Sequence, residues 1–361
     1  MPRKGAGSIA TFLNSPDWDE HERIELVHDR VSGLTAILAL HSTHCGPGAG
    51  GTRFWHYADP ADAMTDALRL SRGMSYKNAM AGLPMGGGKA VVLLDADRRK
   101  TDAMLAAFGD AVEALGGAYV TAEDVGASEA DMVAIAQRTR HVCGLPAEPG
   151  MAGGDPGPFT AFGIYQGIKA AVEFKLGKAS MAGVHVVLQG CGSVGGGVAR
   201  LLAADGAKLT VADIDDAKAA ALADAVGGKA VAAAEIMATP CDVFSPNALG
   251  AILDATGIAA LDCAIVAGGA NNQIARPENG LELWQRDILY APDYVINAGG
   301  IINVSLEYLA RRDGQPCTVD EVNRRIGQIP DRLREIWHQS AEKGQGAEIV
   351  AGDMARKLIG R

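Results

Sequence analysis

The chain has 361 residues, 48% of them hydrophobic and 21% charged, which excludes wholesale disorder and allows two domains with separate cores. The formal net charge of −10 argues against nucleic acid as a partner, because phosphate backbones require clustered cations. No apolar run reaches the length of a membrane span, and no signal-peptide core follows the basic N-terminus. We therefore expect a cytoplasmic protein without a membrane partner.

The first part of the chain mixes short strands with amphipathic helices. A buried strand is predicted at Leu34–His41, and the glycines of Gly46–Gly51 predict a loop that another group can approach closely. Further predicted features, in chain order, are a helix starting at Asp59-Pro60, a strand at Ala90–Leu94, a helix from Thr101, a strand at Ala118–Thr121 and a capping box formed by Ser128 with Asp131.

A proline- and glycine-rich stretch at 146–158 predicts the domain boundary. Beyond it strands alternate with helices, which predicts a parallel sheet wrapped by helices. We expect a two-domain α/β protein. Residues 1–148, completed by a C-terminal segment of about 318–361 that returns to them, form a substrate-binding and oligomerisation domain; residues 149–317 form a Rossmann domain with a doubly wound parallel sheet. Its expected strands are Val184–Leu188, Lys208–Ala212, Asp242–Ser245, Cys263–Ala267 and Tyr294–Ile296.

The strongest local motif is Gly190-Cys191-Gly192-Ser193-Val194-Gly195, which lies between an apolar strand and a helix, as dinucleotide binding requires. Gly190 permits a tight turn, Gly192 lets the backbone approach a pyrophosphate, and Gly195 allows close helix–strand packing. The helix N-terminus supplies free N–H groups to phosphate. The alternative is a tight strand–helix turn without a ligand.

A carboxylate at the end of the next strand indicates which nicotinamide cofactor binds. Asp213 would accept hydrogen bonds from the ribose hydroxyls and repel the 2′-phosphate of NADP, which favours NAD. Asp215 and Asp216 are rivals for this role, and one of them is expected to cap the following helix.

Lys77 and Lys89 lie twelve positions apart among glycines and apolar residues. Desolvation lowers a lysine's pKa and makes it a base near neutral pH. The alternative is a glycine-rich turn with two solvated lysines, and this segment alone does not distinguish the two. Two lysines and an aspartate, without a serine–histidine pair or a metal-ligand cluster, suit chemistry on an amino acid. One lysine would hold the carboxylate, the other would take protons from water attacking an iminium carbon, and the aspartate would exchange protons with the amine.

The six cysteines show no CxxC spacing, so they predict small buried thiols rather than a zinc site or a redox pair, and no metal is expected.

Several stretches, in order and over most of the chain, carry a family resemblance. The chain resembles the glutamate/leucine/phenylalanine/valine dehydrogenase superfamily, and is most similar to its leucine (branched-chain) members. The matching stretches are Gly46–Arg53, Met74–Lys89, Thr121–Gly126, Gly190–Gly195, Gly269–Gln273 and Ala291–Gly300.

The resemblance implies that an L-amino acid, water and NAD⁺ are converted reversibly to a 2-oxo acid, ammonia and NADH. It implies that Lys89 is the catalytic base and Asp124 its carboxylate partner. The implied substrate contacts are Lys77, Asn272 and Gly50, with a side-chain pocket lined by Ala49, Met74, Ala122, Ile301 and Val304. The expected cofactor contacts are Gly190, Cys191, Gly192, Ser193, Val194, Gly195, Asp213, Thr160 and Asn247.

The apolar character of the implied pocket favours leucine first, then valine and isoleucine. Ala49 opens the pocket, so a phenylalanine dehydrogenase or a relative of broad specificity is the alternative. An alternative function of another class is a non-catalytic nicotinamide-binding sensor. The three residues Lys77, Lys89 and Asp124 argue against this alternative. Because similar enzymes are homo-oligomers, we expect a homo-oligomer as well.

Overall fold

The computed structural model describes residues 13, 15–97 and 99–361. Its contacts divide the chain into two compact units. The first unit comprises the described residues up to Ala79 together with Leu83–Leu145, and the second comprises Met80–Gly82 and Pro146–Arg361. The chain therefore crosses from one unit to the other at the start of the predicted turn-rich stretch, after Leu145. It also crosses on either side of the short segment Met80–Gly82. In the described part of the chain, no helix is both long enough and apolar enough to cross a membrane.

The first unit is built on a five-stranded mixed sheet in the order β1-β2-β4-β3-β5. The first two pairs, β1–β2 and β2–β4, are antiparallel, whereas β3 is parallel to both β4 and β5. The strands are β1 (Arg23–Asp29), β2 (Leu34–Ser42), β3 (Gly48–Trp55), β4 (Gly86–Leu93) and β5 (Tyr119–Glu123), and the helices are α1 (Pro60–Met80), α2 (Asp102–Ala114) and α3 (Glu129–Ala136).

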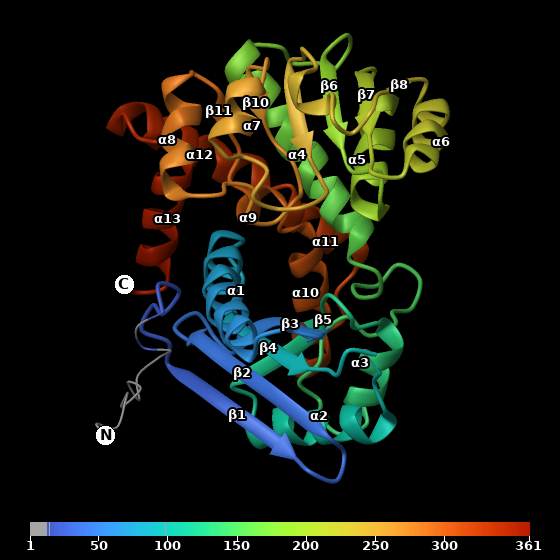
Figure 1. Cartoon of the computed structure of the whole chain (residues 1–361), viewed down its shortest axis with the longest axis vertical. Helices are drawn as coiled ribbons and strands as arrows, with labels where there is room; N and C mark the ends of the chain where they lie inside the picture. The colour runs from blue at the N-terminus through green and yellow to red at the C-terminus, as the bar shows by residue number, and fades with distance from the viewer. Residues whose placement is uncertain (1–12, 14, 98) are drawn as a thin grey trace, which may run out of the picture. The chain divides into compact units, whose positions relative to one another are not determined.

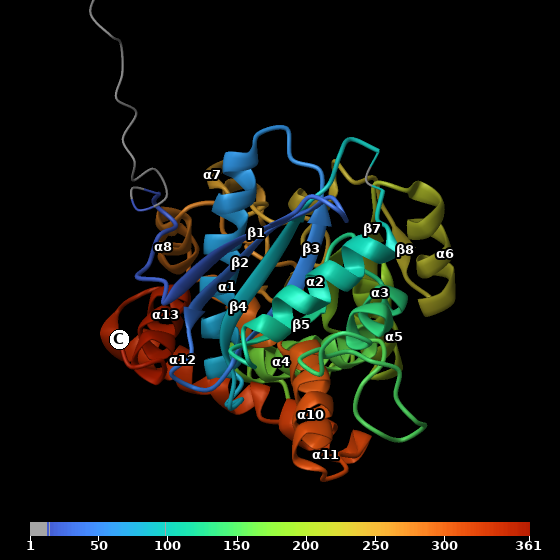
Figure 2. The same ribbon diagram turned by 90° about the horizontal axis from the view of Figure 1, so that it is seen from below.

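Alternation along β2 shows how the helices cover this sheet. Leu38 and Leu40 join a core with residues of α2 and α3, whereas Ile37 and Ala39 pack with residues of α1. Figure 2 shows α1 on one face of the sheet, with α2 and α3 on the other. The predicted helix start at Thr101, which is the N-cap of α2, and the capping box at Ser128 are confirmed.

The second unit contains a six-stranded, wholly parallel sheet in the order β11-β10-β9-β6-β7-β8. This is the strand order of a doubly wound dinucleotide-binding fold, as expected, and the order reverses between β6 and β9. Its elements are shown in Figure 1. The strands are β6 (His185–Gln189), β7 (Lys208–Ala212), β8 (Lys229–Ala230), β9 (Val243–Pro246), β10 (Ile265–Val266) and β11 (Leu289–Tyr290).

Ten α-helices and one short 3₁₀ helix occur in the described second unit. They are α4 (Gly157–Leu176), α5 (Ser193–Ala204), α6 (Asp216–Val226), η1 (Ile236–Ala238), α7 (Ala255–Ala260), α8 (Pro277–Gln285), α9 (Asp293–Ile296), α10 (Gly299–Asp313), α11 (Val319–Ile326), α12 (Ile329–Lys343) and α13 (Ala347–Leu358). Pro330 lies in the first turn of α12, where its missing N–H and fixed φ are tolerated.

Three expectations about local structure need correction. Gly48–Gly51 is not a loop but the start of β3, because pairing with β4 and β5 overrides the low strand propensity of glycine. Tyr294–Ile296 is helix α9, not a strand, since Pro292 breaks the ladder and Asp293 lies in the first helical turn. The C-terminal segment groups with the second unit rather than completing the first, because α12 packs on α4 and α13 on α8.

Candidate active site

Lys89 and Asp124 form a buried ion pair in the first unit. The ammonium Nζ of Lys89 donates to Oδ2 of Asp124 at 2.5 Å, and Lys89 is only 5% exposed. Arg53 donates from Nε to the same oxygen at 3.1 Å and from its terminal nitrogen to Asp66 at 2.7 Å. The alternative of a solvated lysine in a turn is thereby wrong for Lys89, which lies inside strand β4.

The sheet register explains how residues so far apart in the sequence meet. Lys89 lies two residues before Val91, which packs against α1, so the side chain of Lys89 is on the α1 face. Asp124 directly follows β5, whose residue Ala122 is paired with Gly51 of β3. A Cβ on Gly51 would lie 2.7 Å from the Cβ of Asp124. The missing side chain at position 51 therefore leaves room for the carboxylate beside the lysine.

The pKa values of Lys89 and Asp124 are shifted from their ordinary values. Burial lowers the pKa of Lys89, an effect that the charge of Asp124 opposes and that of Arg53 reinforces. Burial alone would raise the pKa of Asp124, but the cations of Lys89 and Arg53 outweigh it and lower that pKa to about 2. The cluster thus keeps an ionised carboxylate next to an amine that can lose its proton, the combination a general base requires.

Lys77 lies in the last turn of α1, one turn after Met74. The buried side chain of Asn78 anchors this turn to the sheet, donating to the carbonyls of Ala49 at 3.3 Å and Gly86 at 2.6 Å. A Cβ on Gly87 would lie 2.1 Å from the backbone nitrogen of Ser75, so glycine is what lets α1 lie directly on the sheet. Lys77 and Lys89 therefore belong to packed elements of the same sheet face.

The predicted pocket residues of the first unit lie around this helix–sheet contact. Ala49 and Ala122 are buried on β3 and β5. A Cβ on Gly50 would lie 3.0 Å from the Cγ of Met74, which places the Met74 side chain over the backbone of β3. Small residues on the strands and a flexible apolar side chain on the helix can accommodate an apolar substituent.

The glycine motif of the second unit has the geometry that a phosphate requires. Gly190 has φ of +94°, and a Cβ on Gly195 would lie 2.0 Å from the Gly190 oxygen, so the tight turn and the close packing are confirmed. A Cβ on Gly192 would meet nothing within 4 Å, and Gly192 caps α5 without a side chain. The first N–H groups of α5 are therefore reachable by an anion, and the loop fits a dinucleotide pyrophosphate.

The carboxylate of Asp213 is fixed against this loop. Its oxygens accept the backbone N–H groups of Cys191 at 2.7 Å and Asp215 at 3.0 Å, and the first of these contributes most to lowering the pKa of Asp213. Asp215 caps α6 through its side chain, as expected for one of the rivals. An ionised Asp213 beside the glycine loop suits a ribose diol and disfavours a 2′-phosphate.

Three more predicted residues lie near the start of α4. A Cβ on Gly300 would lie 2.5 Å from Oγ1 of Thr160, which brings the first turn of α10 against α4. Ile301 and Val304 follow on α10, Val304 being buried. A Cβ on Gly157 would meet Oγ of Ser193 at 2.8 Å, so this corner adjoins the glycine motif.

The remaining two predicted site residues of the second unit are Asn247 and Asn272. Asn247 donates to the Ser245 carbonyl at 2.9 Å and accepts the Gly269 N–H at 2.8 Å, so its side chain links β9 to the loop after β10. Asn272 is exposed, in a left-handed backbone conformation with φ of +52°. Among the described residues, no group of three or more histidine, cysteine, aspartate or glutamate side chains could hold a metal ion.

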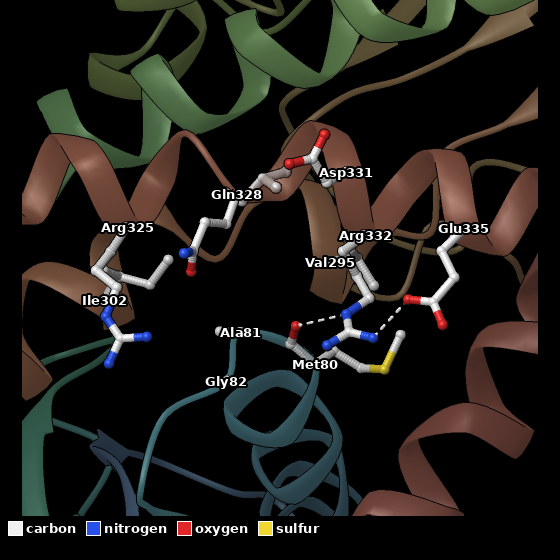
Figure 3. Close-up of a pocket in the computed structure, with 11 residues that line it drawn as sticks. Met80, Ala81, Gly82, Val295, Ile302, Arg325, Gln328, Asp331, Arg332 and Glu335 are labelled. Carbon is white, nitrogen blue, oxygen red and sulfur yellow. Dashed lines mark hydrogen bonds and ion pairs between the residues drawn. The ribbon is translucent and has the colours of Figure 1, made fainter.

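A separate cavity of about 300 Å³ lies in the second unit, where Met80–Gly82 meets helices α9 to α12. Figure 3 shows Arg332 between the Met80 carbonyl and Glu335; its nitrogens lie 3.3 Å and 2.7 Å from these partners. None of the predicted site residues lines this cavity, so we do not assign the chemistry to it.

Two contributors to the site were missed at the level of sequence. Arg53 ends the glycine-rich motif on β3, and Asn78 follows Lys77, yet neither was given a role. The signal for Arg53 was a lone cation two residues after Gly51. If this segment is a strand, residues 51 and 53 lie on the same side of it. Because we predicted a loop at Gly46–Gly51, we did not recognise this signal.

Comparisons with known proteins agree with this geometry. Residues 21–141 match the model of the Glu/Leu/Phe/Val dehydrogenase dimerisation domain, and residues 211–357 match the model of glutamate/leucine/phenylalanine/valine dehydrogenase. A leucine dehydrogenase of Geobacillus stearothermophilus is 41% identical over 94% of this chain and 91% of its own length. A valine dehydrogenase of Streptomyces virginiae is 44% identical over 99% of both. The crystal structure of an L-tryptophan dehydrogenase from Nostoc punctiforme matches with a TM-score of 0.81 and 37% identity, covering 94% of this chain and 96% of the other.

Proposed function

The chain belongs to the glutamate/leucine/phenylalanine/valine dehydrogenase family and is an amino acid dehydrogenase, and we propose that it oxidatively deaminates branched-chain L-amino acids with NAD⁺, leucine first. The buried Lys89–Asp124 pair is the observation that carries the assignment of the chemistry. Curated relatives named for leucine and for valine, at about 40% identity, support the substrate class.

Lys77 would hold the α-carboxylate, for which a lysine at the end of a helix anchored by Asn78 is well placed. When bound, NAD⁺ would accept a hydride from the substrate's α-carbon. Lys89, with its lowered pKa, would take a proton from the water that attacks the resulting iminium carbon. Asp124 would carry protons to and from the amine nitrogen, which then leaves as ammonia.

The preference for NAD over NADP is part of the proposal. It rests on Asp213, whose ionised carboxylate is fixed beside the glycine loop. We further propose a homo-oligomer, because the first unit matches a dimerisation domain. The expected cytoplasmic location and the absence of a metal stay predictions.

A second candidate substrate class is aromatic. Ala49 and Ala122 are both small and buried, so they leave room for a larger side chain, and an L-tryptophan dehydrogenase is among the similar structures. One methylene in an apolar pocket discriminates by only about 1–3 kcal/mol. Comparing kcat/KM for leucine, valine, isoleucine, phenylalanine and tryptophan decides between the two; a preference for an aromatic substrate would overturn the aliphatic assignment.

The chemistry is tested with Lys89→Ala. We expect turnover to fall by about 10²–10⁴-fold, as for loss of a general base, while NADH binding measured by fluorescence stays near normal. Lys208→Ala, at an exposed position on β7, is the matched control and should retain activity. Turnover by Lys89→Ala close to that of the control would refute the role of Lys89, and a wild-type protein that binds NADH but oxidises no amino acid would favour the sensor alternative.

A further inference from the structure

Cys241 and Cys263 lie in the two segments that lead into the neighbouring parallel strands β9 and β10. The register pairs Val243 of β9 with Ile265 of β10. Each cysteine lies two residues before the paired residue, in the segment that leads into the strand, and the N–H of Cys241 donates to the carbonyl of Asp262 at 3.0 Å. This bond holds the two segments side by side ahead of the strands, which brings Cys241 next to Cys263.

The backbone spacing at this point is compatible with a disulfide. Neighbouring strands lie about 4.7–4.9 Å apart, within the Cα separation of roughly 4.4–6.8 Å that a disulfide allows. The two side chains already meet, because the thiols of Cys241 and Cys263 are hydrogen-bonded to each other. Both cysteines are free and only partly buried, so a small reagent can reach them.

The surroundings favour a thiolate at Cys263. The hydrogen bond from Cys241 lowers the pKa of Cys263 and outweighs burial, helped by backbone N–H groups and the charge of Arg286. The same hydrogen bond, with burial, raises the pKa of Cys241, which keeps its proton as the donor. The guanidinium of Arg286 is held in place by the carbonyls of Ile258 and Leu261.

The cysteines at 45, 191 and 317 provide a contrast within the same chain. Burial raises the pKa of each of these thiols. They are therefore expected to remain inert thiols, which is the role predicted for all six cysteines from their spacing. The pair at 241 and 263 departs from that prediction because the two residues, 22 positions apart, are brought together only by the sheet.

We propose that Cys241 and Cys263 are a dithiol site that reacts with small-molecule disulfides to form a reversible bond between the segments that lead into β9 and β10. This site lies outside the amino acid dehydrogenase chemistry and does not depend on it. The reagent class is a low-molecular-weight disulfide such as oxidised glutathione, which acts as the oxidant.

The reaction proceeds in two exchanges. The Cys263 thiolate attacks one sulfur of the small disulfide, which forms a mixed disulfide and releases one thiolate. With Cys263 capped, Cys241 no longer donates to a thiolate; it loses its proton and attacks the Cys263 sulfur, releasing the second thiol. Overall, two protein thiols and one small disulfide give one protein disulfide and two small thiols, so two electrons pass to the reagent.

The experiment treats the folded protein with oxidised glutathione and maps the product without reduction. Cleavage before aspartate separates the two cysteines, because Asp242, Asp254 and Asp262 lie between them. We expect a joined pair of fragments, a loss of two thiols in the denatured protein, and reversal by dithiothreitol. Wild-type protein in which both thiols stay free, or in which each carries its own glutathione, would overturn the proposal.

Two single variants test the order of attack. Cys241→Ser should accumulate a stable glutathione adduct at Cys263, because the resolving thiol is missing. Cys263→Ser should leave Cys241 largely unmodified, and the control Cys317→Ser should still form the 241–263 bond. Equal adduct formation in the first two variants would contradict the assignment of Cys263 as the attacking thiol. If either variant fails to fold, the mapping of the wild-type bond still decides the main proposal.

Discussion

Arg53 and Asp124 are joined by a 3.1 Å hydrogen bond from Nε to Oδ2, the same oxygen that receives Lys89. One carboxylate oxygen therefore serves two cations, and one of these cannot lose its proton at any ordinary pH. Arg53 stabilises the ionised form of Asp124 and, by like-charge repulsion, the neutral form of Lys89. The arginine thus acts on the proposed base without taking a proton itself.

Arg53→Met should move the rising limb of the pH–activity profile to higher pH. The charge of Arg53 lowers the pKa of Lys89, so its removal raises that pKa. A base is active only when neutral, and activity grows as pH rises through its pKa, so kcat/KM at neutral pH should fall. The profile of kcat/KM against pH measures this shift. Arg69→Met is the control, because Arg69 contacts Asp66 but has no bond to Asp124; a limb that stays in place or moves to lower pH argues against the role of Arg53.

Gly51→Ala should lower both the melting temperature and kcat. Its Cβ would lie 2.4 Å from the Glu123 oxygen and 2.7 Å from the Asp124 Cβ, so the backbone after β5 must shift. Overpacking of this kind costs about 1–3 kcal/mol. Gly73→Ala is the matched control: it lies in α1 with nothing within 4 Å of the added carbon, and should stabilise by about 0.5–1 kcal/mol. Equal effects of the two substitutions on Tm and kcat would contradict the packing argument.

Asp213→Asn should reduce the preference for NAD over NADP. The amide oxygen can still accept one of the two backbone N–H groups, from Cys191 or Asp215, and the uncharged side chain no longer repels a 2′-phosphate. We expect the ratio of kcat/KM for the two cofactors to change by about tenfold or more, which corresponds to about 1.4 kcal/mol. Asp216→Asn, in the exposed first turn of α6, serves as the control. The same change in both variants would show that net charge, and not position 213, determines the preference.

Asn78→Ala should raise KM for the amino acid while leaving KM for the cofactor unchanged. Asn78 is fully buried and holds the end of α1 on β3 and β4, so its loss frees the turn that carries Lys77 and removes two hydrogen bonds to backbone carbonyls. Such a loss costs about 1–3 kcal/mol. Steady-state kinetics and Tm measure the two effects. A parallel rise in both KM values would point to general unfolding rather than to misplacement of Lys77.

Much of the second unit was predictable because its signals are local. The order of apolar strand, glycine motif, helix and second strand lies within residues 184–212, and each step is set by neighbours in the chain. The caps at Thr101, Ser128 and Asp215 are equally local, since a side chain there bonds to a backbone N–H two or three residues on. Where tertiary pairing competes with local preference, as at Gly48–Gly51, the local prediction was wrong.

From the order of its residues alone, this chain determined the alternation of its elements and the dinucleotide fingerprint, and its resemblance to a known family marked Lys89 and Asp124 as candidates. Only the tertiary structure decided that Arg53 shares the oxygen of Asp124 with Lys89, and that Cys241 meets Cys263. The reason is physical: strand register sets distant residues side by side, and burial strips their water. Neither quantity is a property of any short stretch of sequence.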